Sequence, residues 1–379
     1  MIHFLHQADE THAFISNHLA TATCALFKWH SLTGETGEIR GQMFLERILR
    51  KQSDEGWFLE YEGTDPGYET LCLYYLSDLH RLRPDLNLQE ALARSIRFLW
   101  HFAHPDGSFG GLYGSRNTRF YYPAGLEVLA GRVPEAAALA GFMQRSIGQR
   151  RVVTLETMDE PNLIPMFNAY CLAAAQVAQS PEKAPSGLPP VPSQCQEPFR
   201  KVFPDAGLMV DKGEFHYTIL SLFKGGVVYH FRAPGHRVRV NSGVLIRNRR
   251  GDLYSTQGFH SGIRVLQQGD RYEIRASFTR VSNQLPTPFQ FLLLRVACLT
   301  LMRFRLPREL VKKFLVKLLI TGKNQIDLTN TRVITLGQDL QVADRQEGEM
   351  SGFERLPADS SFSAIHMASQ GYWQTQDDH

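Results

Sequence analysis

One short segment of the sequence gathers side chains that could bind a sugar and move a proton. Residues 54–79 read DEGWFLEYEGTDPGYETLCLYYLSDL, an acidic, glycine-rich loop that leads into a predicted helix. Trp57, Tyr61 and Tyr68 offer flat aromatic faces of the kind that stack on sugar rings, and Glu60 offers an acceptor for hydroxyl groups. Carboxyl and phenol groups also serve in general acid–base catalysis. Because a plain connection needs only turn-forming residues, this loop predicts one wall of a binding site.

A second glycine loop repeats part of this pattern further along the chain. SDEGWF (53–58) and HPDGSFGG (104–111) both follow predicted helices. Two similar loops between pairs of helices predict a weak internal repeat whose loops gather on one rim of the fold. The residues after the second loop that we expect to contact a substrate are Arg116, Asn117, Arg119, Tyr121 and Tyr122.

The elements that must position these loops change character along the chain. Residues 1–180 place apolar residues at spacings of three and four, which predicts a helical domain. The proline-rich segment 181–198 predicts a linker. In 199–379 the period becomes two, as in EFHYTILSLFKGGVVYHFRAP (214–234), which predicts strands and a hairpin. The expected fold class is therefore α+β and multidomain, with an incomplete (α/α) toroid followed by an antiparallel β-sandwich.

A segment within the predicted sandwich is helical, apolar and basic at once. Residues 288–323 read PFQFLLLRVACLTLMRFRLPRELVKKFLVKLLITGK, and within 295–323 eight arginines and lysines stand against Glu309 alone. Pro307 predicts a break between two short helices. One interpretation is a helical insertion packed on the sheets, and the other is attachment to an anionic membrane surface.

The overall composition narrows the class of protein. A length of 379 residues is typical of two or three domains, and a net charge of +3 gives no reason to expect nucleic acid as a partner. The five cysteines form no CxxC motif, which favours a reducing compartment. The first residues, MIHFLHQADETH, show no signal peptide, and no long apolar stretch predicts a spanning helix. We expect a cytoplasmic protein, with a peripheral position on the inner membrane as the alternative.

Three segments in a fixed order resemble a known group of enzymes. SNHLATATCALF (16–27) places an Asn-His pair at the start of a helix, and DEGWFLEYEGTDPGY (54–68) places an acidic loop before a helical tyrosine. RSIRFLWHFAHPDGSFGGLYGSRN (95–117) supplies the next helix and glycine loop. This set resembles the heparinase II/III-like polysaccharide lyases and, more loosely, alginate lyases of the same architecture. The resemblance covers most of the chain as a layout and implies a toroid that is short or open.

The resemblance implies β-elimination on a bacterial surface glycan that contains uronic acid. Such a reaction needs a group that neutralises the sugar carboxylate, a base that takes the C5 proton and an acid that protonates the leaving O4. Similarity places Asn17 and His18 in the first role and Tyr68 in the acid role, and in the base role once ionised. An ordinary tyrosine titrates near 10, so service as a base needs nearby positive charge, for which Arg116 and Arg119 are candidates.

The β half of such lyases often supplies a histidine-rich strand. The comparable stretch here, YHFRAPGHRVRVNSG (229–243), carries His230 and His236. We expect His236 among the catalytic residues and His230 among those that bind substrate. No histidine pair has metal-ligand spacing on one element, so no cofactor is expected, although a divalent metal in the sandwich is left open.

Two other functions fit the same residues. A glycoside hydrolase on a helical toroid would use two carboxyl groups from the set Glu60, Glu62, Asp54 and Asp65. A non-catalytic glycan-binding or scaffold protein of exopolysaccharide assembly would bind sugar without turnover and would be held at the membrane by 288–323. The products separate these alternatives, because only elimination leaves an unsaturated uronate that absorbs in the near ultraviolet.

Overall fold

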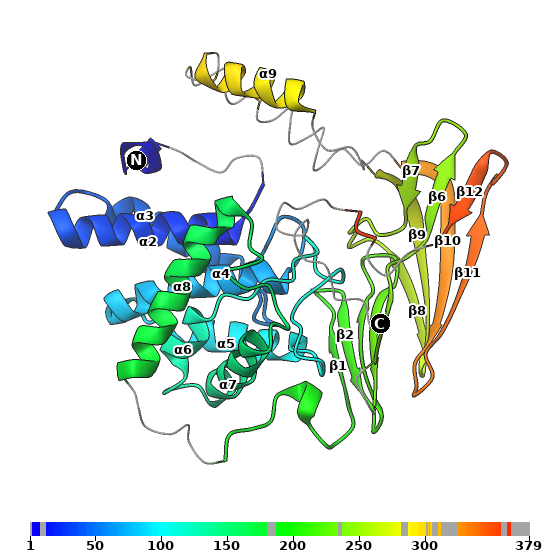
Figure 1. Ribbon diagram of the computed structural model, residues 1–379, viewed down its shortest axis with the longest axis horizontal. Helices are drawn as coiled ribbons and strands as arrows, with labels where there is room; N and C mark the ends of the chain where they lie inside the picture. Colours follow the sequence, from blue (N-terminus) through cyan, green and yellow to red (C-terminus); the bar gives the residue numbers. More distant parts are fainter. Residues whose placement is uncertain are drawn as a thin grey trace.

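The chain folds into a helical half followed by a half built from two sheets, as Figure 1 shows. The computed structural model describes residues 2–7, 13–179, 187–233, 237–281, 287–300, 302, 304, 310–311, 325–357 and 362–364. The mixed α+β class with antiparallel sheets in the C-terminal region is confirmed. The two halves share one hydrophobic core, so loops from both can meet at their junction.

The helices of the first half pair into hairpins that lie side by side. Their bounds are α1 (Ile2–Gln7), α2 (Ser16–Thr33), α3 (Glu38–Arg50), α4 (Pro66–Leu82), α5 (Gln89–Leu99), α6 (Ala124–Leu129), α7 (Pro134–Gly148) and α8 (Glu160–Gln179), with short 3₁₀ turns η1 (Pro84–Leu86), η2 (Trp100–Phe102) and η3 (Pro192–Gln194). Helices α2, α4, α6 and α8 are successive neighbours in one layer, while α3, α5 and α7 pack behind them. Helix α4 is buried on nearly every side, which makes it the central support of the helical half.

The strands form two sheets in which every pair is antiparallel. The first sheet runs in sequence order through β1 (Phe199–Phe203), β2 (Leu208–Lys212), β3 (His216–Ser221), β4 (Val227–Arg232) and β5 (Arg237–Asn241). The second has the order β11-β10-β9-β7-β6-β12, and β8 also pairs with β9. Its strands are β6 (Leu245–Asn248), β7 (Leu253–Ser255), β8 (Arg264–Gln268), β9 (Arg271–Val281), β10 (Gln325–Thr335), β11 (Gln341–Glu347) and β12 (Phe353–Leu356).

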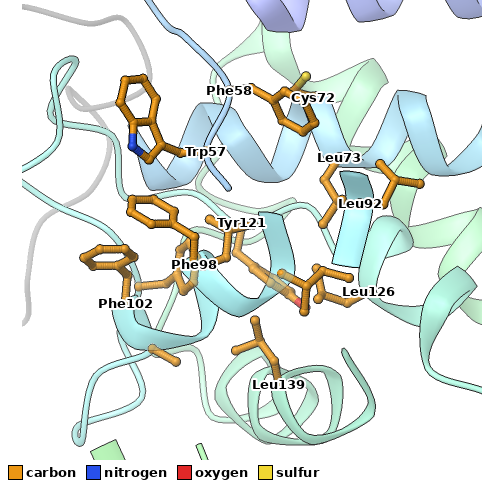
Figure 2. Packing of buried hydrophobic residues seen from close by; sticks show 14 of the residues in the cluster. Trp57, Phe58, Cys72, Leu73, Leu92, Phe98, Phe102, Tyr121, Leu126 and Leu139 are labelled. Carbon is orange, nitrogen blue, oxygen red and sulfur yellow. The ribbon is translucent and has the colours of Figure 1, made fainter. Parts of the chain in front are cut away.

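The first sheet is the middle layer of the molecule. Successive side chains of a strand point to opposite faces, so alternate residues of β4 serve two different cores. Val227, Tyr229 and Phe231 belong to the core shared with the helices, whereas Val228 packs with Ile274 of the second sheet. Figure 2 shows the helical side of the shared core.

A helix interrupts the second sheet between β9 and β10, inside the segment predicted to be an insertion. Helix α9 spans Pro288–Leu299, and most of the remainder of 288–323 lies outside the described residues. Within the described part of the chain, no helix combines the length and apolar character needed to cross a bilayer.

Candidate functional site

The first feature of the site is a buried carboxyl group held by the start of α2. A short bridge pairs Ile15 with Glu60, and the side-chain Nδ2 of Asn17 donates to Glu60 Oε2 at 2.8 Å. Glu60 is only 3% exposed, and its Oε1 has no hydrogen-bond partner among the described residues. Burial raises its pKa to about 8, the charge of Asp65 adds to that shift, and the Asn17 hydrogen bond and Arg116 oppose it. Glu60 is therefore a carboxyl group that holds a proton near neutral pH and has one unused oxygen.

Tyr68 lies beside this carboxyl group in the first turn of α4. The ring meets that of Phe120 edge-on, with centroids 5.1 Å apart. Burial is the main reason that the phenol pKa rises above its ordinary value of 10.0, and Glu60 and Asp65 raise it further while Arg116 lowers it. Arg116 thus acts in the expected direction, but burial outweighs it. Tyr68 keeps its proton at neutral pH, which suits a proton donor and not the base role expected from the sequence.

Asp65 fixes the geometry between the two loops. As the N-cap of α4 it accepts from the backbone N–H of Tyr68 at 3.2 Å, and Pro66 follows at the first helical position. Its Oδ2 accepts from the backbone N–H groups of Arg116 at 2.9 Å and Thr118 at 3.3 Å, and Oδ1 accepts from the Thr118 hydroxyl. Gly67 must stay small because a Cβ there would collide with Thr118. Both carboxylate oxygens are therefore occupied in holding the second loop on α4.

Arg116 and Tyr61 form a cation–π pair, and the Arg116 charge acts on Glu60. The Arg116 guanidinium carbon lies 4.3 Å from the centroid of the Tyr61 ring. Tyr61 has φ 59° and Asn117 has φ 63°, a left-handed conformation that is uncommon for any residue other than glycine and costly for an aromatic one. Backbone held in such regions clusters at functional sites, which supports a role for both loops.

The β half closes the site with a lysine that the sequence analysis missed. Lys224, in the turn between β3 and β4, is fully buried and donates to the carbonyls of Leu112 at 2.6 Å and Gly114 at 2.9 Å and to Asn117 Oδ1. Burial lowers its pKa to about 7, Asp65 opposes that shift and Arg116 adds to it. The only sequence signal was a charged residue before Gly225 in an otherwise apolar hairpin, which indicates a turn as readily as a junction.

We expect Lys224→Met to weaken the junction of the two halves. The change removes the donor from three buried acceptors, and unsatisfied buried groups are costly, so the free energy of unfolding should fall by about 3 kcal/mol. Urea unfolding of the two proteins measures this difference. The exposed Lys201 of β1 is the matched control, and Lys201→Met should change stability by less than about 0.5 kcal/mol. Equal stability of the wild type and Lys224→Met would show that the lysine does not join the halves.

Several predicted site residues come together around Glu60. Asn17 donates to Glu60, the Arg116 charge lowers the Glu60 pKa, and the Glu60 charge raises the pKa of Tyr68. Tyr61 follows Glu60 in the chain and pairs with Arg116. Three further predicted residues border this group. Asn117 joins it to Lys224, His18 follows Asn17 on α2 with an exposed side chain, and the half-buried Arg119 reaches the Tyr229 hydroxyl at 3.5 Å.

Other predicted residues lie elsewhere for clear physical reasons. Trp57, Tyr121 and Tyr122 pack in the hydrophobic cores and present no open face for a sugar; Figure 2 shows the first two. His230 lies on the opposite face of β4 from Tyr229, where its ring contacts Thr218 Oγ1 at 2.8 Å and the Gln338 carbonyl at 3.2 Å. The alternation along β4 therefore directs it away from the helices. His236 lies outside the described residues.

Metals and pockets do not extend the site. Among the described residues, no group of three or more histidine, cysteine, aspartate or glutamate side chains is arranged to hold a metal ion. Two pockets in the described part of the chain lie on the β half, one beside Phe259 and His260 and the other beside Arg200 and His216. Neither of these two pockets is lined by Glu60 or Tyr68.

No protein-family model matches the chain, and no curated protein matches it. The geometry around Glu60 is therefore the basis for inferring a function.

Proposed function

We propose that the protein is a polysaccharide lyase that resembles the heparinase II/III-like group and cleaves a uronic-acid-containing glycan by β-elimination. In this proposal the stacked helical hairpins are an incomplete (α/α) toroid, and the sheets are the β-sandwich that closes its rim. The observation that carries the proposal is Glu60: a buried carboxyl group with one oxygen held by Asn17, the other unused, and a phenol and a guanidinium beside it.

These groups match the three requirements of elimination. Arg116 supplies positive charge for the sugar carboxylate, so that charge developing at C5 is stabilised. Glu60, when ionised, takes the proton as the C5–H bond breaks. The electron pair forms the C4–C5 double bond, the C4–O4 bond breaks, and Tyr68 gives its proton to O4. Asn17 takes a role different from the one implied by the resemblance, because its amide donates to Glu60 and orients that carboxyl group.

The carboxyl groups favour elimination over hydrolysis. Canonical glycoside hydrolysis needs two carboxyl groups that flank the scissile bond. Asp65 is committed to the helix cap and to the second loop, while Glu62 and Asp54 are exposed on the protein surface. Of the four carboxyl groups weighed for a hydrolase, Glu60 is the one that combines burial with an unused oxygen.

A second candidate is a glycan-binding protein without turnover. It is favoured by the burial of Glu60 and of three aromatic residues expected to contact sugar, Trp57, Tyr121 and Tyr122. It predicts that glycan binding is unchanged in Tyr68→Phe.

The products of incubation with a panel of uronate polysaccharides test the proposal. The lyase predicts near-ultraviolet absorbance that grows together with new reducing ends. Reducing ends without absorbance would show hydrolysis, and binding to a glycan with neither signal would support the non-catalytic candidate.

A further inference from the structure

Helix α9 exposes a row of large apolar side chains. Six of its residues are between 41% and 66% exposed: Phe289, Leu292, Leu293, Leu294, Val296 and Leu299. In Figure 1 this helix, drawn in yellow at the top, lies beyond the edge of both halves. Its exposed side chains therefore lack the cover that the cores give to the other helices.

The spacing of these residues fits a helix that buries one apolar face. A surface helix usually keeps one apolar stripe for the protein and a polar face for water, and a groove-bound helix likewise buries positions i, i+3, i+4 and i+7. Phe289, Leu292, Leu293, Val296 and Leu299 follow the spacing i, i+3, i+4, i+7 and i+10, so they form one apolar face, and Leu294 lies outside it. The interface between headgroups and acyl chains accepts such a face.

The charge of the surrounding sequence favours anionic lipid. Helix α9 itself carries one charged residue, Arg295, and its side chain is exposed. From this arginine to residue 323 the sequence holds eight lysines and arginines and one acidic residue, in a chain whose net charge is only +3. Each basic residue near an anionic membrane surface contributes about 1 kcal/mol of attraction.

The length of the helix fits one leaflet. Its 12 residues span about 18 Å, while the hydrocarbon core of a bilayer is about 30 Å thick. Such a helix can enter the interface between headgroups and acyl chains without crossing the membrane.

We propose that α9 inserts into the surface of a membrane that contains anionic lipids and attaches the protein to it. Apolar insertion supplies the anchor, and the basic residues that follow select the negatively charged surface. The inference does not depend on the reaction at Glu60, because no residue of that site takes part.

Co-sedimentation of the full chain with vesicles tests this attachment. We expect binding to phosphatidylcholine vesicles that contain phosphatidylglycerol, at least about tenfold weaker binding to phosphatidylcholine alone, and weakening with salt as the charges are screened. Leu293→Glu should lower binding at least about tenfold, because it places a negative charge on the inserted surface. The control is Leu266→Glu in β8, a leucine that is 64% exposed and lies outside α9, and it should bind like the wild type.

Three results would overturn the proposal. The first is absence of binding to both vesicles, and the second is an equal loss in the two leucine variants. The third is a dimer in solution that Leu293→Glu dissociates, which would show that a second copy of the chain covers α9.

Discussion

Tyr68→Phe should reduce glycan turnover by about 10²- to 10⁴-fold, the range that a positioned acid or base contributes. The change removes the phenol proton that we assign to the leaving oxygen and keeps the ring that packs edge-on against Phe120. The fold should therefore be retained, and glycan affinity should change far less than kcat. Steady-state kinetics together with a binding measurement separates the two effects.

The matched control is Tyr74→Phe on the same helix. Tyr74 is 5% exposed, and its ring packs against Tyr75 in the neighbouring hydrophobic cluster. This variant should turn over glycan like the wild type. Wild-type rates in Tyr68→Phe would show that Tyr68 is not the proton donor. Equal losses of rate in both variants would indicate a general effect on the fold.

Glu60→Gln should also abolish turnover, with a loss of at least about 10²-fold, because an amide cannot accept the C5 proton. The glutamine oxygen can still accept from Asn17, so the loop should keep its position. In the wild type the rate should rise with pH until Glu60 is ionised, through about pH 8. Tyr68 keeps its proton in that range because its pKa is raised above 10.0.

The free energy of unfolding should also depend on pH, and it should differ between the wild type and Glu60→Gln. The pKa of Glu60 is about 8 in the folded chain and has its ordinary value of 4.5 when unfolded. Between these values the unfolded chain has released a proton that the folded chain retains, so the wild type loses stability as pH rises through this window. Glu60→Gln lacks that loss, and its free energy of unfolding relative to the wild type should increase with pH.

Glu62→Gln is the control for both measurements. It lies two residues away on the same loop with an exposed side chain. It should leave the rate and the pH dependence of stability unchanged. If Glu60→Gln cleaves glycan at the wild-type rate, the base is another group.

The positions of helices and strands could be predicted from the sequence more accurately than the burial of their side chains. Periodicity predicted a helix where α4 lies and a strand where β4 lies. An aromatic side chain can stack on a sugar or pack in a core, and only the tertiary structure decides between these two positions. Trp57 and Tyr121 are such residues, since both are buried in the core shared by the two halves.

The site itself was predicted in part, for reasons that are also physical. Asn17 and Tyr68 were recognised by residue type and order, but their common partner Glu60 depends on a bridge between segments far apart in the chain. Alternation along β4 predicts that His230 and Tyr229 point to opposite faces, but it does not say which face packs on the helices. The register and packing of β4 decide this. The position of Lys224 depends on how the two halves dock, and no local pattern encodes that contact.

The ionisation of Glu60 is the most direct test of the account, because it needs no substrate. The carboxyl ¹³C signal of Glu60, assigned by its absence in Glu60→Gln, can be followed by NMR as pH is raised. We predict a transition near pH 8, produced by burial and by the nearby charge of Asp65. A transition near the ordinary value of 4.5 would show a solvated carboxylate and would contradict the proposed proton chemistry.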